Sequence, residues 1–379
     1  MAGLVVGIDA SRNRSGGAIA HLKGILGQGD PPSCDISEVH VWSYRRLLDV
    51  LPDAPWLVKH NPCELEKSIL EQVWWQFCAL PKAARKVGCD VLFATDAATV
   101  CRFRPMVVLS QDMLSYESGV MNSYGFTKEW FRLLLILWIQ NRAMKRADGV
   151  IFLTRYAKKV IQKSTGKLKR VAIIPHGVGN DFRLHRDVES GKRVPESSIQ
   201  CLYVSNLDMY KHQWVVVRAV AKLRAKGYPV ELTLAGGGGG RPKQLLDAEL
   251  AACDPKGDFV KDVGFVRHGD LPRLLAEADC FIFASSCENL PVTLLEAMAA
   301  GLPIACSNRG PMPEVLEDGG VYFDPENSES ISLAVEKLLN DGELRLSFAT
   351  RAREIAEKYS WAGCAWQTWS FLRKTVSAK

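Results

Sequence analysis

Two glutamates, Glu288 and Glu296, are separated by seven residues within the stretch FIFASSCENLPVTLLEAMAAGLP, residues 281–303. The stretch predicts a buried strand, a short polar turn and a helix that Asn289 caps and whose first turn holds Pro291. Because a helix rises about 1.5 Å per residue, the two carboxylates lie roughly 12 Å apart and cannot share one proton or one metal ion. They can instead hold the two ends of one elongated ligand, and the free N–H groups at the helix start favour an anion between them.

The same stretch also fits an ordinary helix with a capped start and a solvated Glu296. Against that interpretation, Glu296 is flanked by Leu294, Leu295, Ala297 and Met298. An ionised carboxylate among apolar neighbours needs a partner. The spacing alone leaves both interpretations open.

A glycine pair early in the chain is a second candidate for anion binding. Gly16 and Gly17 stand between the predicted strand 4–8 and an apolar-periodic segment, AIAHLKGIL. A glycine loop between a strand and a helix can bring backbone N–H groups close to a phosphate. Glycine is also the usual residue at a sharp bend, so the pair equally fits a simple turn.

Polar residues follow two further predicted strands. Gln111 and Asp112 come after strand 106–109, and His176 comes after strand 170–174. Ligands in open α/β sheets bind at the carboxyl ends of the strands, so these three side chains are candidates for substrate contact. The alternatives are a loop or helix cap for the first two and a hydrogen-bonded turn residue for the histidine.

Composition excludes several classes of protein. The chain has 379 residues, of which 47% are hydrophobic, so it can build two domains with their own cores. The net charge of +6 is spread along the sequence without a block of like charges, which argues against nucleic-acid binding. The eleven cysteines include no C-x-x-C pair, so we expect neither a disulfide framework nor a metal cluster.

We expect a cytoplasmic protein. The first residues, MAGLVVGIDAS, predict a strand rather than a signal peptide, and the longest apolar run, 133–139, is too short for the roughly 20 residues of a spanning helix. Segment 128–146 is apolar in the middle and basic at its flanks. It is either a core helix with snorkelling ends or a peripheral contact with the inner membrane face.

The order of predicted elements indicates two α/β domains. Strands alternate with helices on both sides of a charged segment, 184–198, which we interpret as a linker. The predicted domains are 1–183 and 199–359, with a C-terminal helix, 360–379, packed back on the first. The glycine run 236–240 completes no dinucleotide-binding fingerprint, so it is expected to be a loop.

Nearly the whole chain resembles the glycosyltransferases of family 4, which are retaining, nucleotide-sugar-dependent enzymes. The resemblance is carried by SSCENLPVTLLEAMAAGLPI and the following SNRGPMPEVLEDGGVYFDP. It implies the GT-B fold, in which two Rossmann-like parallel-sheet domains face an interdomain cleft. It further implies synthesis of a bacterial cell-surface polysaccharide such as lipopolysaccharide, with GDP-mannose or GDP-rhamnose as the preferred donor.

By position, the resemblance assigns Glu288 to the donor sugar, Glu296 to the ribose hydroxyls and Lys211 to the phosphate charge. Gly16 and Gly17 are similar to the family's glycine loop beside the same diphosphate. The donor-binding turn falls on Asn289, Leu290, Pro291, Val292 and Thr293.

Two positions depart from the family. Asn206 stands in the donor site where an arginine is usual, and Gln111 stands where many relatives have a histidine beside the donor sugar. An amide can hydrogen-bond a hydroxyl but cannot titrate. Arg12 or Arg14, beside the glycine pair, is a candidate for the missing charge.

The expected reaction moves a hexose from a nucleotide diphosphate sugar to a saccharide or lipid-linked saccharide. The largest contribution is electrostatic, because negative charge develops on the departing diphosphate. No metal and no cofactor are expected, since the nucleotide sugar is itself a substrate. The alternatives are a GT-B epimerase or phosphorylase and a non-catalytic protein that binds nucleotide sugars.

Overall fold

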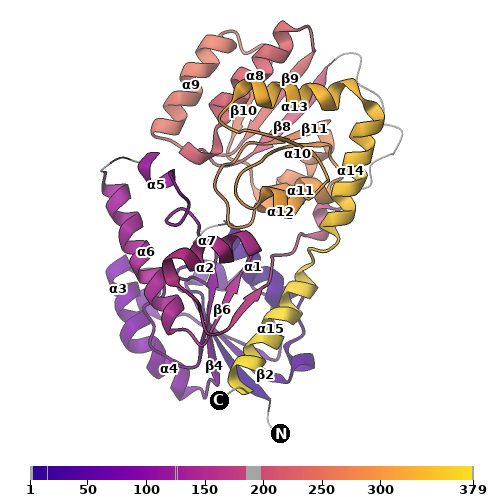
Figure 1. Cartoon of the computed structure of the whole chain (residues 1–379). Coiled ribbons are helices and arrows are strands. Elements are labelled where there is room, and N and C mark those ends of the chain that lie inside the picture. The colour runs from indigo at the N-terminus through magenta and orange to yellow at the C-terminus, as the bar shows by residue number, and fades with distance from the viewer. Residues whose placement is uncertain (1–2, 15, 124, 126, 185–197, 378–379) are drawn as a thin grey trace. The chain divides into compact units, whose positions relative to one another are not determined.

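Short apolar runs form the strands of two separate sheets, each within one unit of the chain. The computed structural model describes residues 3–14, 16–123, 125, 127–184 and 198–377. One unit is Met1–Gly177 together with Ser360–Lys379, and the other is Val178–Tyr359 (Figure 1). Nearly all of the predicted linker lies outside the described residues.

The sheet of the first unit has seven strands, all parallel, in the order β3-β2-β1-β4-β5-β6-β7. The strand order reverses direction between β1 and β4, so their carboxyl ends form a topological switch point. The strands are β1 (Leu4–Asp9), β2 (Ile36–Trp42), β3 (Leu57–His60), β4 (Val91–Ala94), β5 (Met106–Ser110), β6 (Gly149–Phe152) and β7 (Val171–Ile173).

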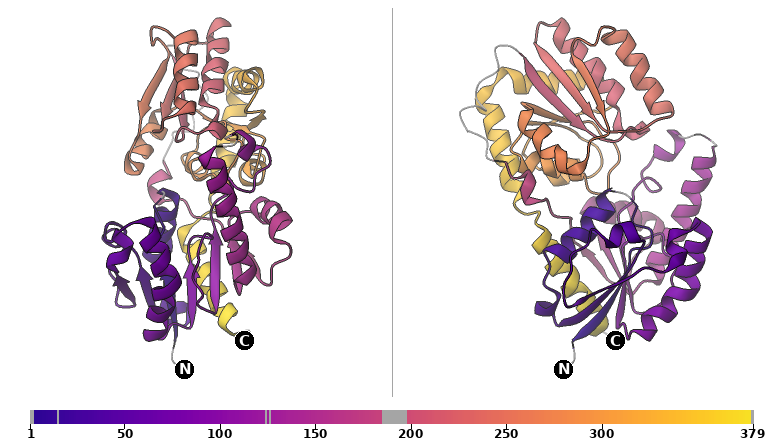
Figure 2. Two further views of the ribbon diagram at one scale, coloured as in Figure 1. Left: turned by 90° about the vertical axis from the view of Figure 1, so that its left-hand side faces the viewer. Right: turned by 180° about the vertical axis from the view of Figure 1, so that it is seen from behind.

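Helices lie on both sides of this sheet (Figure 2). The helices of the first unit are α1 (Gly16–Gly27), α2 (Arg45–Leu48), α3 (Ile69–Trp74), α4 (Leu80–Lys86), α5 (Val120–Ser123), α6 (Lys128–Arg146), α7 (Arg155–Thr165) and α15 (Trp361–Ser377). Short 3-10 or π segments are η1 (Pro31–Cys34), η2 (Cys63–Glu66) and η3 (Trp75–Ala79).

Helix α15 packs against α1 although the two are far apart in the sequence. Gly24 of α1 makes room for Trp361, since a Cβ on this glycine would lie 2.2 Å from the indole ring. Trp361 and Trp369 are buried, whereas Trp366 is 62% exposed. Helix α15 therefore buries two of its three tryptophans.

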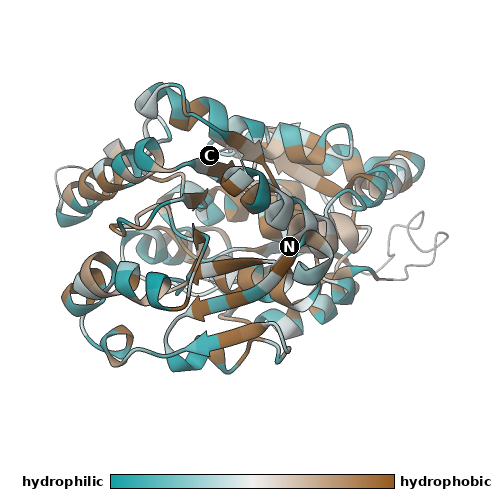
Figure 3. Ribbon diagram, turned by 90° about the horizontal axis from the view of Figure 1, so that it is seen from below, coloured by the Kyte–Doolittle hydropathy of each residue, from teal (hydrophilic) through white to brown (hydrophobic). Residues whose placement is uncertain are grey.

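The second unit has a six-stranded parallel sheet in the order β10-β9-β8-β11-β12-β13. Its strands are drawn mostly in hydrophobic colours, as are those of the first unit (Figure 3). The strands are β8 (Ile199–Val204), β9 (Val230–Ala235), β10 (Val260–Gly264), β11 (Cys280–Phe283), β12 (Ile304–Ser307) and β13 (Val321–Phe323).

Helix α8 packs against both α9 and α13 in the second unit. Its helices are α8 (Gln213–Ala225), α9 (Arg241–Cys253), α10 (Leu271–Glu277), α11 (Val292–Ala299), α12 (Met312–Leu316), α13 (Ser328–Asn340) and α14 (Gly342–Ala356), with 3-10 turns η4 (Asn180–Phe182), η5 (Met209–Lys211) and η6 (His268–Asp270). Two parallel Rossmann-like sheets confirm the predicted α/β class.

Residues 63–86 form η2, α3, a π-helical turn and α4 rather than one continuous helix. The domain boundary differs from the sequence prediction. The first crossing between units is at Gly177, six residues before the predicted domain end at 183. Within the described residues, no helix is long and apolar enough to cross a membrane.

Candidate functional site

An ion pair joins two loops at the carboxyl ends of neighbouring strands in the second unit. Lys211 ends η5, which follows β8, and Glu288 lies in the turn after β11, which is paired with β8. The Lys211 Nζ donates a hydrogen bond to Glu288 Oε1, and the two side chains are only 13% and 15% exposed. The Tyr203 hydroxyl donates to the Lys211 carbonyl at 2.6 Å and so fixes the backbone of the lysine.

A histidine and a serine join the same two loops a second time. His212 has a left-handed backbone with φ of 53° at the start of α8, and its Nε2 lies 2.9 Å from Ser286 Oγ. Burial lowers the pKa of His212 to about 4, so its ring is neutral at pH 7. The loops are therefore held by one charged and one neutral contact.

The helix that starts beside Glu288 is shorter than predicted. It spans Val292–Ala299, its N-cap is Pro291, and no side chain caps it, so the predicted capping by Asn289 is wrong. Asn289 is instead 5% exposed within the preceding turn. The first N–H groups of a helix have no intrahelical partners, and in α11 these belong to the predicted donor-binding residues Val292 and Thr293.

The second glutamate has the partner that its apolar neighbours require. Glu296 is 3% exposed, and its Oε1 lies 2.6 Å from His268 Nε2 of η6. Burial raises the pKa of Glu296, and the hydrogen bond with His268 opposes this rise. The His268 ring also contacts Phe182, with ring centroids 5.1 Å apart. The alternative interpretation, in which Glu296 is solvated, is therefore wrong.

The glycine run after β9 is the predicted loop, and it packs under Asn206. A Cβ on Gly236 would lie 1.9 Å from the Ser205 carbonyl oxygen, so only glycine fits there. The Asn206 carbonyl accepts a hydrogen bond from Gln213 Nε2 at 3.0 Å, while the residue itself is exposed. The structure thus places a neutral, exposed side chain at the position where the resemblance implies an arginine.

Another arginine of this unit lies in the loop after β12, the strand that pairs with β11. This residue is Arg309, and its guanidinium contacts both Asp324 carboxylate oxygens at 3.3 Å. Burial is the main cause of the low pKa of His212; the charge of Asp324 opposes it and that of Arg309 adds to it. The neighbouring Gly310 lies against the turn, since a Cβ there would be 3.9 Å from the Glu288 nitrogen. Nothing in the sequence pattern singled out Arg309.

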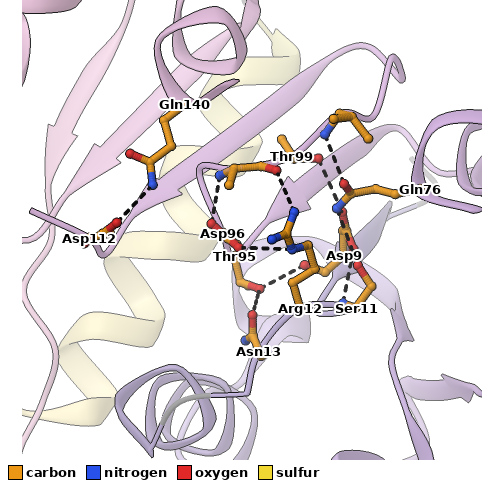
Figure 4. Close-up of polar contacts among 12 residues, drawn as sticks. Asp9, Ser11, Arg12, Asn13, Gln76, Thr95, Asp96, Thr99, Asp112 and Gln140 are labelled. Atoms are coloured by element: carbon orange, nitrogen blue, oxygen red, sulfur yellow. Dashed lines mark hydrogen bonds and ion pairs between the residues drawn. The ribbon is translucent and has the colours of Figure 1, made fainter. Parts of the chain in front are cut away.

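In the first unit, a polar network occupies the switch point at the carboxyl ends of β1 and β4 (Figure 4). Asp9 is 3% exposed and accepts hydrogen bonds from Ser11 Oγ at 2.7 Å and Gln76 Nε2 at 2.6 Å. Burial raises the pKa of Asp9, and these hydrogen bonds oppose the rise. The Thr95 hydroxyl contacts Asn13 Oδ1 at 2.8 Å. Sequence reasoning missed Asp9 and Gln76, which are 67 positions apart.

The two candidate arginines of the first unit are engaged within it. Arg12 approaches the Asp96 carboxylate at 3.8 Å (Figure 4). Arg14 donates to the Leu65 carbonyl at 3.0 Å and stacks on Tyr44, 3.6 Å from the ring centroid. Neither side chain is an uncommitted cation.

The residues after β5 have local hydrogen bonds. Gln111 Nε2 donates to the Thr95 carbonyl at 2.7 Å, and one Asp112 oxygen accepts from the Leu114 N–H at 3.0 Å. Gln140 Nε2 lies 3.5 Å from the other Asp112 oxygen (Figure 4). Burial raises the pKa of Asp112. The local bonds fit the loop interpretation, and substrate contact by these residues stays a prediction.

The remaining predicted site residues of this unit lie apart from the network. Gly16 and Gly17 are the first residues of α1 rather than a loop before it. His176 is 3% exposed and stacks on His21, with ring centroids 4.6 Å apart. Neither ring nitrogen of His176 has a hydrogen-bond partner in the described part of the chain, and burial lowers its pKa to about 3. It is therefore not a hydrogen-bonded turn residue.

Among the described residues, no group of three or more His, Cys, Asp or Glu side chains is arranged to hold a metal ion. Beside the start of α11, the described residues include the charged pair of Lys211 and Glu288, and Arg309 lies in the loop after β12. This arrangement can bind a polar ligand with an anionic part beside its hydroxyl groups.

Comparison with known proteins gives matches over both units. Residues 187–355 match the family described as Glycosyl transferases group 1. O-antigen chain mannosyltransferase B of Escherichia coli is 36% identical over 110 residues, 29% of this chain and 29% of that protein. A GDP-mannose-dependent alpha-(1-6)-phosphatidylinositol monomannoside mannosyltransferase of Mycobacterium tuberculosis is 27% identical over 298 residues, 73% of this chain and 75% of that protein.

The fold is also that of solved proteins. The crystal structure of Anabaena HepE in complex with UDP and glucose matches with a TM-score of 0.71 at 18% identity, covering 99% of each chain. With two parallel Rossmann-like sheets, this likeness shows the GT-B fold. The chain spans 29%, 59% and 45% of the length of three curated relatives that it matches.

The contact between His268 and Glu296 predicts a change in titration. Replacing His268 with alanine removes the hydrogen bond that opposes the effect of burial, so the pKa of Glu296 rises further. Because an acid whose pKa is raised on folding loses stability between its unfolded and its folded pKa, the free energy of unfolding falls with rising pH over a window whose upper end moves upward in His268→Ala. Carbon-13 NMR of the glutamate carboxyl groups measures the shift, with Glu296→Gln identifying the signal.

His268→Gln is the matched control, because glutamine can still donate a hydrogen bond without a charge. In His268→Gln, the titration midpoint of the Glu296 carboxyl group should fall between those of the wild type and His268→Ala. If the midpoint in His268→Ala is unchanged or lower, His268 does not stabilise the ionised Glu296.

Proposed function

We propose that this GT-B chain, whose residues 187–355 belong to the glycosyl transferases group 1 family, is a retaining hexosyltransferase that uses a nucleotide diphosphate sugar. The observation that supports this most is the Lys211–Glu288 ion pair beside the start of α11. It brings together the two residues to which the sequence resemblance gave separate roles. The acceptor in this proposal is a saccharide or a lipid-linked saccharide of cell-surface polysaccharide synthesis.

In the proposed reaction, the bond between the anomeric carbon and the diphosphate breaks, and a bond to the acceptor oxygen forms on the same face. The acceptor proton goes to the departing phosphate oxygen, so no protein base is required. Lys211 and the first N–H groups of α11 stabilise the charge that develops on the diphosphate. Glu288 holds the lysine in place and accepts a hydrogen bond from a donor-sugar hydroxyl. Glu296 binds the ribose hydroxyls, with His268 orienting its carboxylate.

Arg309 supplies the second cation in this proposal, in place of the family's arginine at Asn206. The next residue in its loop, Gly310, approaches the Glu288 turn, whereas Arg12 and Arg14 are held within the first unit. With Lys211, Arg309 gives the diphosphate two positive charges without a metal ion. The reaction is therefore proposed to be metal-independent.

The donor is proposed to be GDP-mannose or GDP-rhamnose. The names of two relatives support a mannosyl donor, one of them specifying GDP-mannose. The Anabaena structure contains UDP and glucose, so UDP sugars are the alternative to test.

A peripheral membrane contact is also proposed, through α6 of the first unit. Phe131, Leu135 and Trp138 on this helix are 61%, 58% and 61% exposed. Its last turn carries Lys145 and Arg146, which can meet anionic lipid headgroups. A cytoplasmic protein on the inner membrane face would reach a lipid-linked acceptor in this way.

A non-catalytic nucleotide-sugar-binding protein is the second candidate, favoured by the neutral Asn206. Nucleotide release separates the candidates: a transferase releases nucleotide faster with acceptor, and a binding protein releases none. An epimerase consumes the donor without forming a glycosidic bond.

Lys211→Ala is expected to lower kcat by about 100- to 1,000-fold, because it removes a charge placed where the leaving group becomes negative. Glu288→Gln should have a similar effect, since it frees the lysine and weakens the contact with the sugar. Nucleotide release from GDP-mannose measures both variants.

Lys222→Ala is the matched control, because Lys222 forms a surface ion pair with Glu329 in the same unit. It should retain wild-type turnover, and all three variants should keep the wild-type circular dichroism spectrum. Wild-type turnover in a folded Lys211→Ala variant would show that Lys211 does not stabilise the leaving diphosphate.

Arg309→Ala should lower kcat/KM about tenfold, less than Lys211→Ala, because the arginine is half-exposed and shared with Asp324. Arg351→Ala controls for loss of a surface arginine, since Arg351 pairs with Asp318 and is 40% exposed. Steady-state kinetics measure kcat/KM for both variants. If Arg309→Ala and Arg351→Ala have equal kcat/KM, Arg309 is not the second cation.

A further inference from the structure

A polar cavity lies in the first unit between α6, α7 and the loop that follows β5. It has a volume of about 460 Å³. Cavities of this size hold small organic ligands rather than a bare ion. Its lining is dominated by hydroxyl and charged groups, including Lys159, Lys163 and Glu117.

The walls of the cavity are tied together by side-chain hydrogen bonds. The Tyr116 hydroxyl donates to Asn141 Oδ1 at 3.1 Å, and Asn141 Nδ2 donates to Ser164 Oγ at 2.6 Å. The Tyr156 hydroxyl lies 2.7 and 2.8 Å from the two oxygens of Glu117. These contacts link the loop, α6 and α7, so the cavity is preorganised.

The two lysines are the groups that these contacts leave uncommitted. Lys159 and Lys163 are four residues apart on α7, so they lie on one face of the helix, and both are exposed. Lys163 interacts electrostatically with Glu117, whose pKa is raised by burial. Lys159 has no carboxylate partner within the described residues. The cavity therefore has an uncompensated positive charge.

The cavity is close to the residues predicted to contact the sugar or the acceptor. Ser115 and Tyr116 follow Asp112 within one short loop. Burial raises the pKa of Tyr116, and the nearby charge of Asp112 adds to the rise. A ligand in the cavity would therefore contact the loop that also carries Asp112.

We propose that this cavity binds a phosphate-bearing sugar as part of the acceptor. The proposal rests on the proposed transferase function. Lys159 and Lys163 bind the phosphate oxygens, and the Ser118 and Ser164 hydroxyls and the Glu117 carboxylate bind the sugar hydroxyls. Tyr116 offers an aromatic face to the sugar ring. An acceptor with a neutral terminal sugar would leave the ammonium group of Lys159 without an anionic partner.

Isothermal titration calorimetry with mannose 6-phosphate tests the proposal directly, without donor. Binding to the wild type is expected, and the Kd should rise at least tenfold in the double variant Lys159→Ala with Lys163→Ala. Mannose and inorganic phosphate should each bind more weakly than mannose 6-phosphate. Far-UV circular dichroism and the thermal midpoint establish that the double variant is folded.

Two control variants test whether binding depends on the lysines of this cavity rather than on other lysines. Lys158→Ala removes a lysine of the same helix that does not line the cavity, and Lys211→Ala removes the phosphate-binding lysine of the donor site. Both should bind mannose 6-phosphate as the wild type does. The proposal is overturned by absent wild-type binding, by wild-type affinity in the double variant, by loss in Lys211→Ala, or by inorganic phosphate binding equally well.

Donor consumption distinguishes failure of this proposal from failure of the proposed function. If the chain consumes no nucleotide sugar but still binds mannose 6-phosphate through the two lysines, the proposed transferase function is wrong and the proposed phosphosugar site is supported. If it transfers sugar but binds mannose 6-phosphate independently of the two lysines, only the proposed phosphosugar site is wrong.

Discussion

The contact between Lys211 and Glu288 is the interaction on which the account of the second unit depends. Both side chains are largely removed from solvent, so each charge needs the other when no ligand is bound. Removing one partner of such a pair leaves the other charge uncompensated, which costs more than the pair contributes. A diphosphate can replace Glu288 as the partner of the lysine, and this links the stability of the loops to ligand binding.

Helix α11 sets the distance between the two glutamates of the candidate site. Glu288 precedes its first turn, and Glu296 lies inside it, held by His268 from η6. A ligand that reaches both carboxylates must place its anionic part near the first N–H groups of the helix, where the dipole favours negative charge. Sugar, diphosphate and ribose in series have this order. We propose that Arg309, from the loop after β12, supplies the charge that Asn206 lacks.

Local patterns in the sequence predicted those features that depend on neighbouring residues. The apolar runs and the alternation of strands with helices gave both parallel sheets, and the spacing of Glu288 and Glu296 placed one before α11 and one inside it. The apolar neighbours of Glu296 showed that it needs a partner. They could not identify His268, because that contact joins residues 28 positions apart through the fold.

The features that were missed depend on tertiary packing. Asp9 and Gln76 meet only after the first sheet forms, and the buried pair of His21 and His176 forms only when α15 returns to α1. Asn289 has a strong capping propensity, yet it is buried in the turn and the helix starts after Pro291. In each case the packing of distant segments outweighs the local preference of the sequence.

A crystal structure of the chain with GDP tests the central claim most directly. The account predicts that the diphosphate lies within about 4 Å of the Lys211 ammonium group, as an ion pair requires, and next to the first N–H groups of α11. It also predicts that the ribose hydroxyls contact the Glu296 carboxylate. A diphosphate bound away from Lys211, or a ribose that does not reach Glu296, would contradict the account.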